Sequence, residues 1–127
     1  MENTQKLRNA RNVLLKLHKT LVDYEREMYE GIHGPMTAAQ FLNVLLEDQD
    51  LAWLRKFSML IVEIDEMFDI KDGVSGEMVN ASLVKVVELA EMRGDDESFK
   101  TKYQSALQQY PEAAGSHAEL KRILSEN

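Results

Sequence analysis

The chain has 127 residues, of which 44% are hydrophobic, and it carries a formal net charge of −7. This length suits a single domain, and the hydrophobic content is sufficient for an ordinary core. The chain contains no cysteine, which excludes disulfide bonds and zinc sites built on thiolates.

The charge is unevenly distributed along the chain. Residues 1–46 carry six basic and five acidic side chains, whereas residues 47–77 carry three basic and nine acidic ones. An acidic surface repels phosphate backbones, so we expect no nucleic-acid partner. The acidic segment is interpreted as a solvated face, with a docking face for a basic partner as the alternative.

The N-terminal stretch is polar and charged, unlike a signal peptide or a membrane anchor. In the most apolar segment of the chain, the longest uncharged run is Phe57–Val62, which is too short to cross a bilayer. Together with the lack of cysteine, these features predict a cytoplasmic protein that has no membrane partner.

The first predicted helix runs from about residue 3 to residue 32 and is ended by Gly31, Gly34 and Pro35. Its hydrophobic residues alternate in spacings of three and four, which is typical of a coiled-coil seam. The positions of this seam are Leu7, Ala10, Leu14, Leu17, Leu21, Tyr24 and Met28.

A second apolar row on the same helix consists of Leu15, Val22 and Tyr29. One packing surface does not need both rows, and surplus apolar rows often mark a partner surface. We therefore predict a homodimer formed through this row, unless the short helix that follows covers it.

A capping box at 37–40 predicts a short helix that continues to Leu46. The next predicted helix spans residues 50–69, with Asp50 as its cap, and most of its circumference is apolar. This helix is therefore expected to lie at the centre of the fold. Its apolar stripe comprises Leu54, Phe57, Ile61, Ile64 and Phe68, and it is interrupted by Asp65.

Beyond a turn at 71–76, Ser75 is expected to start another helix that stops at Gly94, and Asp95 or Asp96 to start a fifth. Pro111 and Gly115 are expected to bound a connector, with a second capping box at 116–119 opening a terminal helix.

The predicted fold is thus all-α: one domain over residues 1–127, packed as a bundle of four main helices plus two short ones. Residues 95–127 have fewer apolar residues per turn and are expected to be less stable.

The stretch GPMTAAQFLNVLLEDQDLAWLRKFSMLIVEIDE, with the preceding LHKTLVDYERE, resembles a family of small uncharacterised bacterial all-helical proteins. The resemblance covers roughly residues 18–66. It implies helices and a cytosolic location, and it implies no activity and no functional residues.

Three polar residues suggest a site. His18 and Glu25 lie on a polar ladder between the two apolar rows, and Asp65 would join them if the two long helices pack together. A carboxylate holding an imidazole is a general acid–base arrangement, but the same contacts describe a structural network. We expect Asp65 to be largely buried and bonded to His18, whose pKa would then rise, with Arg11 or Tyr24 as alternative partners.

A metal site is a further hypothesis. Glu30 and His33 have the Glu-x-x-His spacing of helical di-iron proteins, but the motif occurs once and at a helix end. A histidine at a helix C-terminus also interacts favourably with the helix dipole, so we expect no metal and no other cofactor.

The sequence therefore predicts a non-enzymatic helical protein that acts in protein interaction or regulation, forms a homodimer and binds another protein. One alternative is a metal- or acid–base-dependent enzyme using His18, Glu25 and Asp65. The other is a carrier or sensor of a small apolar ligand bound near Trp53 and Phe57.

Overall fold

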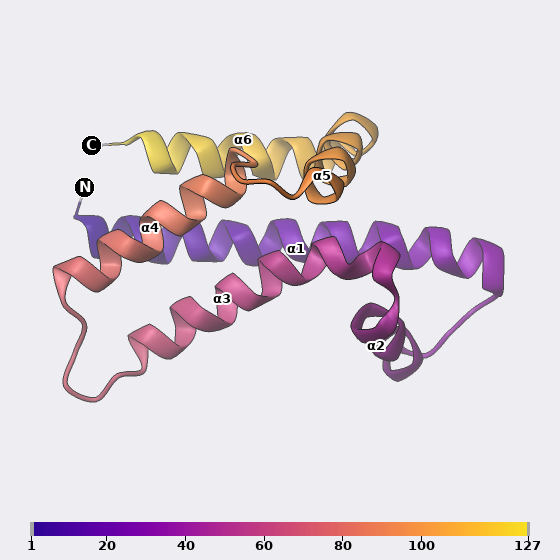
Figure 1. The fold of residues 1–127 in the computed structure, drawn as a ribbon, viewed down its shortest axis with the longest axis horizontal. Coiled ribbons are helices and arrows are strands. Elements are labelled where there is room, and N and C mark those ends of the chain that lie inside the picture. Colours follow the sequence, from indigo (N-terminus) through magenta and orange to yellow (C-terminus); the bar gives the residue numbers. More distant parts are fainter. Residues whose placement is uncertain (1, 127) are drawn as a thin grey trace.

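A computed structural model describes residues 2–126, and all its regular elements are helices (Figure 1). The all-α prediction is confirmed. The elements in chain order are α1 (Asn3–His33), α2 (Ala38–Glu47), the 3₁₀ helix η1 (Gln49–Leu54), α3 (Arg55–Phe68), α4 (Gly76–Ala90), α5 (Glu97–Gln109) and α6 (Pro111–Ser125).

Helix α1 is the element about which the others are arranged. It packs most extensively against α6 and also against α3, α4 and η1. Figure 1 shows it running the length of the molecule, with α6 along one side and α3 along the other. The sequence placed residues 50–69 at the centre of the fold; the structure gives that place to α1.

The buried face of α1 follows the predicted seam over its first five positions and then departs from it. Tyr24 is half-buried and Met28 is exposed, whereas Val13, which lies outside the seam, is buried. The fully covered residues of α1 are Leu7, Ala10, Val13, Leu14, Leu17 and Leu21. Helix α1 therefore has a buried stripe wide enough to serve α3, α4 and α6.

The predicted helix over residues 50–69 is divided into η1 and α3. The side chain of Asp48, not that of Asp50, accepts the first backbone N–H, from Asp50 at 2.8 Å. Four residues of the predicted stripe are buried: Leu54, Phe57, Ile61 and Ile64. The fifth, Phe68, is half-buried beneath the guanidinium of Arg8, which lies 4.0 Å from the ring centroid.

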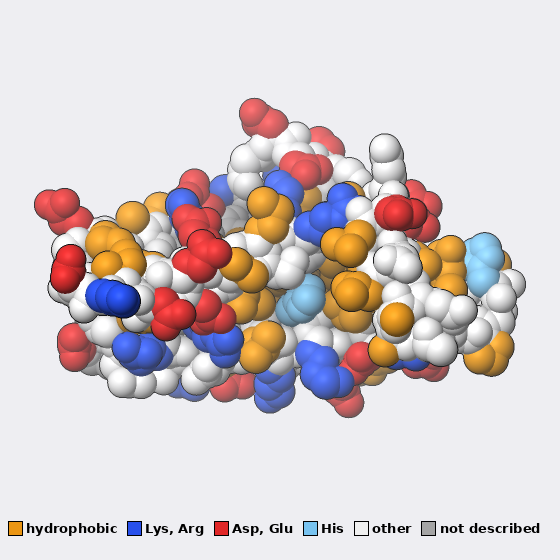
Figure 2. All heavy atoms as spheres, turned by 90° about the horizontal axis from the view of Figure 1, so that it is seen from below, with side chains coloured by type: hydrophobic (Ala, Val, Ile, Leu, Met, Phe, Trp, Pro, Cys, Tyr) orange, Lys and Arg blue, Asp and Glu red, His pale blue; other side chains and the backbone are white. Residues whose placement is uncertain are grey.

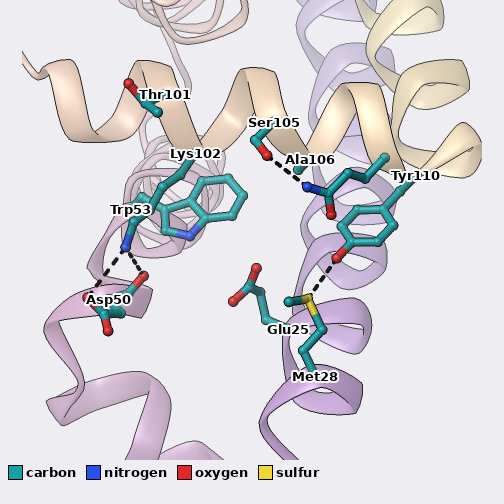
Figure 3. A pocket seen from close by; sticks show the side chains of 10 residues that line it. Glu25, Met28, Asp50, Trp53, Thr101, Lys102, Ser105, Ala106 and Tyr110 are labelled. Carbon is teal, nitrogen blue, oxygen red and sulfur yellow. Dashed lines mark hydrogen bonds and ion pairs between the residues drawn. The ribbon is translucent and has the colours of Figure 1, made fainter. Parts of the chain in front are cut away.

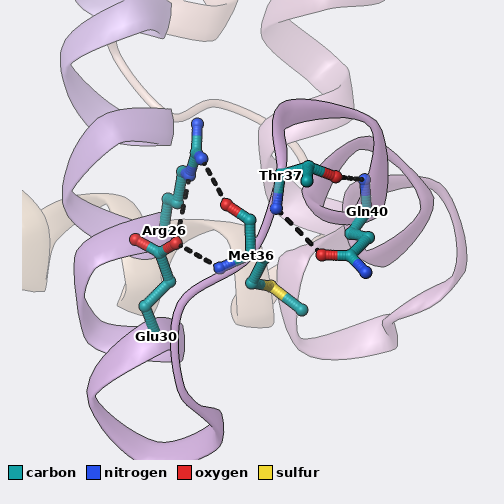
Figure 4. Close-up of polar contacts among 5 residues, drawn as sticks. All are labelled: Arg26, Glu30, Met36, Thr37 and Gln40. Atoms are coloured by element: carbon teal, nitrogen blue, oxygen red, sulfur yellow. Dashed lines mark hydrogen bonds and ion pairs between the residues drawn. The ribbon is translucent and has the colours of Figure 1, made fainter.

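The loop between α1 and α2 is fixed by polar contacts to the backbone (Figure 4). Arg26 donates to the carbonyl oxygen of Met36 at 2.7 Å, and a carboxylate oxygen of Glu30 accepts the Met36 N–H at 2.8 Å. The capping box that opens α2 is confirmed, with Thr37 and Gln40 bonded reciprocally at 3.1 and 2.9 Å.

The prediction for the C-terminus of the chain is wrong at one boundary. Helix α6 begins at Pro111 and contains Gly115, so it starts well before the predicted capping box at 116–119. Proline is well tolerated in the first turn of a helix, because a backbone N–H at that position has no acceptor within the helix and its loss costs nothing. Ser116 is buried on the face that packs on α1, together with Ala113, Leu120 and Ile123.

Helix α5 adds aromatic residues to the core. Phe99 and Tyr103 are buried against Trp53 and Phe57, with ring centroids 5.1 to 6.4 Å apart. The hydroxyl of Tyr103 bonds to Nδ1 of His117 at 2.7 Å, which links α5 to α6. The lower stability expected of residues 95–127 stays a prediction.

Two adjacent leucines of α1 test this packing. Leu14 is 0% exposed and Leu15 is 44% exposed, so Leu14→Ala should lower the free energy of unfolding by about 2–5 kcal/mol through lost burial and a residual cavity. Leu15→Ala is the matched control and should cost less than about 1 kcal/mol. Urea melts followed by circular dichroism measure both values. Similar losses for the two variants would contradict the assignment of the buried face.

Candidate functional site

The candidate site is an open groove of about 460 Å³ between α1, η1 and α5 (Figure 3). Each of these helices contributes both polar and apolar side chains to it. The groove is lined by Glu25, Met28, Asp50, Trp53, Thr101, Lys102, Ser105, Ala106, Gln109 and Tyr110.

Trp53 forms the apolar base of the groove. The 3₁₀ turns of η1 bury its indole against Phe57, Phe99 and Tyr103, with one edge left facing the groove. Because three aromatic rings hold it, this indole is a fixed surface rather than a mobile one.

Tyr110, at the junction of α5 and α6, forms an aromatic wall. Its ring stacks on that of Tyr24 with centroids 4.0 Å apart and planes 7° from parallel. Its hydroxyl donates to the sulfur of Met28 at 2.9 Å. Burial raises the pKa of the Tyr110 hydroxyl, and the negative charges of Glu25 and Glu27 raise it further.

Lys102 lies at the rim, where η1 holds its ammonium group. It donates to the carbonyl oxygen of Asp50 and lies 3.7 Å from the carboxylate of the same residue. Figure 3 shows the ammonium directed at Asp50, away from the carboxylate of Glu25. The ammonium group of Lys102 is therefore already paired with Asp50 and makes no hydrogen bond to Glu25.

Glu25 is the unusual group of the groove. Its carboxylate is half-buried, and no side chain or backbone N–H within residues 2–126 donates a hydrogen bond to it. Burial raises the pKa of Glu25 above its ordinary value; Lys102 opposes this shift and Asp50 adds to it. A carboxylate kept partly from water without a donor gains from any cation that reaches it.

The groove as a whole suits a cation. Glu25 and Asp50 contribute two negative charges and Lys102 one positive charge, which leaves a net charge of −1. Trp53 and Tyr110 add apolar surface, against which the aliphatic stem of a lysine or arginine side chain can pack.

The three residues of the acid–base hypothesis are not brought together. Asp65 is paired with Arg11, whose Nε and Nη2 reach its two carboxylate oxygens at 2.8 Å each. Glu25 lies fourteen residues from Arg11 on the same helix, about 21 Å along its axis. The carboxylates of Asp65 and Glu25 therefore serve different surfaces.

Two expectations about these residues are wrong. The side chain of Asp65 is 47% exposed rather than buried, and its partner is Arg11, which was the alternative to His18. His18 packs against the ring of Phe57 instead, and burial lowers its imidazole pKa where the expected pairing would have raised it. An ion pair this accessible contributes only about 0.2–1 kcal/mol.

Glu30 and His33 are used at the end of α1 for contacts within the protein. Glu30 accepts from the Met36 backbone and pairs with Arg26, and His33 packs on Tyr29 with centroids 4.2 Å apart. In the described part of the chain, no cluster of three or more His, Asp or Glu side chains is placed to hold a metal ion.

The predicted interaction row is only partly open. Leu15 is exposed, whereas Val22 and Tyr29 are half-buried against the core. Tyr29 contacts Phe41 of α2 edge-on, at 6.2 Å between centroids. The short helix therefore covers one end of the row, which was the alternative to a partner surface.

No protein-family model, curated protein or solved structure matches the chain. The resemblance of residues 18–66 to small bacterial helical proteins therefore stays a prediction. Over residues 2–126, no helix combines the length and the hydrophobicity that a bilayer crossing requires.

The burial of Glu25 predicts a pH dependence of stability. The folded chain binds the Glu25 proton more tightly than the unfolded chain, so this group lowers the free energy of unfolding as pH rises from 4.5 through its raised pKa. Glu25→Gln should therefore be more stable than wild type at pH 7, with a smaller advantage at pH 4. Urea melts at the two pH values measure this difference, and Glu27→Gln controls for the loss of one charge. An advantage that is equal at both pH values would refute the assignment.

Proposed function

We propose that this protein is a non-enzymatic interaction module that binds a basic side chain of a partner protein in the groove around Glu25. The observation that carries the proposal is the half-buried carboxylate of Glu25, which has no hydrogen-bond donor within residues 2–126 and lies beside Trp53 and Tyr110.

The shape of the groove favours a side chain presented by another protein. The groove is open to solvent and is lined by residues as far apart in the sequence as Met28 on α1 and Thr101 on α5, so a partner backbone can remain on the surface. The aliphatic stem of a lysine or arginine would lie against Met28 and Trp53 while its charged head reaches Glu25.

The two alternative functions have weaker support. An acid–base enzyme needs His18, Glu25 and Asp65 within reach of one another, and Asp65 is engaged by Arg11 elsewhere on α1. A carrier of an apolar ligand needs an apolar cavity, whereas the groove beside Trp53 has charged side chains of Glu25, Asp50 and Lys102.

The proposal includes a cytoplasmic location and a basic protein partner. A cysteine-free chain with a net charge of −7 fits a cytoplasmic location and a basic protein partner. The same charge disfavours nucleic acid as a partner.

The only tryptophan of the chain reports on this site directly. Titration with Nα-acetyl-lysine amide or Nα-acetyl-arginine amide should give a saturable change in Trp53 fluorescence, with a Kd on the order of 1 mM because a single side chain is bound. Glu25→Gln should weaken this binding about tenfold, since the ion pair is lost.

Two controls complete the titration. Lysine amide acetylated at both nitrogens keeps the stem and loses the charge, so it should give no saturable change. Glu27→Gln should bind as wild type does. A response that is the same in the wild type and in Glu25→Gln, or the same for charged and neutral ligands, would refute the proposal.

We further propose self-association through the exposed part of the apolar row on α1. The Arg11–Asp65 and His18–Phe57 contacts set α1 antiparallel to α3, which places Leu15 opposite residues 60–61. Val62, the next residue of α3, is 53% exposed. Figure 2 shows hydrophobic side chains gathered in the middle of the face that is seen from below.

Light scattering tests this self-association. Wild type should show a dimer at high concentration, and Leu15→Glu or Val62→Glu should give a monomer because a buried charge disfavours an apolar interface. Ile32→Glu, at an exposed position near the end of α1, is the control and should remain dimeric. A wild-type protein that stays monomeric at high concentration would refute the proposed self-association.

A further inference from the structure

A second groove, of about 360 Å³, lies between α3 and α4 and is separate from the groove around Glu25. Its residues come from the second half of α3, the turn after it and the first ten residues of α4. They are Glu63, Glu66, Met67, Ile70, Met78, Ala81, Ser82 and Lys85.

The floor of this second groove is apolar and rich in methionine. Met67 is buried and receives a hydrogen bond from Ser82 at its sulfur, at 3.5 Å, while Met78 is half-buried beside it. Methionine side chains are flexible and polarisable, so they adjust to differently shaped apolar groups. Ile70 is 42% exposed at the end of the groove and gives it an accessible apolar edge.

One further apolar residue of α3 lies near the groove. Met59, one turn before Glu63 on the same face of α3, is a large hydrophobic residue that remains exposed. From Met59 to Phe68, the last residue of α3, the chain advances by nine residues, about 13 Å along the helix, and Ile70 lies in the turn beyond it. Apolar residues at positions i, i+4 and i+7 of a partner helix span about 10 Å, so they fit within this length.

The rim of the groove is acidic. Glu63 is paired with Lys85 across the groove, whereas no group within residues 2–126 donates a hydrogen bond to the exposed carboxylate of Glu66. Residues 63–77, which contain the second half of α3 and the turn after it, carry six acidic side chains and one basic side chain. In Figure 2, acidic and basic side chains both border hydrophobic ones at the left end of the molecule, where Figure 1 places the end of α3.

We propose that the α3–α4 groove binds a basic amphipathic helix of a partner protein. Apolar side chains of that helix insert over Met67, Met78 and Ile70, and its lysine or arginine side chains meet Glu66 and the acidic turn. The charge of residues 63–77 selects a basic partner over an acidic one, and the methionine floor accepts anchors of differing shape. This site goes beyond the proposed function, because it lies on other helices and recognises a helix rather than a single side chain.

A fluorescein-labelled 14-residue helical peptide of leucine and lysine, with leucine on one face, tests the proposal by fluorescence anisotropy. A peptide with glutamate in place of lysine tests the charge, and a scrambled leucine–lysine peptide tests the amphipathic face. The protein variants are Glu66→Lys and Ile70→Ser, both at exposed positions. Glu47→Lys, on α2, is the control that changes the net charge equally on a different helix.

Wild type should bind the amphipathic basic peptide at micromolar concentration. Glu66→Lys and Ile70→Ser should each weaken binding about five- to tenfold, whereas Glu47→Lys should change it less than twofold. Glu25→Gln should bind the peptide as wild type does, which separates this site from the groove around Glu25.

Three results would overturn the proposal. They are an absence of binding, equal losses in Glu66→Lys and Glu47→Lys, and equal binding of the glutamate or scrambled peptides. Circular dichroism of each variant confirms that its helices are intact, so that weakened binding reports on the groove itself.

Discussion

The burial of one wide stripe of α1 is the interaction on which the other helices depend. Leu7, Leu14, Leu17 and Leu21 are almost completely covered, and α3, α4 and α6 each bury part of their own apolar surface against this stripe. Isolated helices of 13 to 15 residues are marginal in water, so α3 to α6 owe their stability largely to this shared packing. The two proposed binding grooves lie where the helices around α1 meet.

The sequence predicted helix starts well where a residue type meets a need of the backbone itself. The caps at Thr37, Ser75 and Asp96 are all present, because a side-chain oxygen at a helix start satisfies an otherwise unpaired N–H whatever the tertiary fold. The same reasoning failed at Pro111, where a residue taken as a breaker opens a helix. Proline is compatible with both roles, and only the packing of Ala113 and Ser116 on the core decides between them.

The candidate site was less accessible from the sequence, because its parts come from distant segments. Glu25 could be singled out from its place on a polar ladder, but Lys102 and Tyr110 become its neighbours only through the packing of α5. The position of Asp65 was misjudged for a related reason. An aspartate within an apolar stripe indicates burial. Asp65 instead pairs with Arg11 where α3 lies against α1, at a position that water can reach.

The continuity of α1 has a consequence for avidity. Its 31 residues form one uninterrupted helix about 46 Å long, which holds the groove around Glu25 and the helix pair α3–α4 at a separation that no flexible linker can alter. A partner carrying both a basic side chain and an amphipathic helix at the matching distance would bind its second element at a high effective concentration. A partner with a different spacing between its basic side chain and its helix could fill only one groove at a time and would gain no affinity from the second element. The fixed length of α1 would therefore select partners by this spacing.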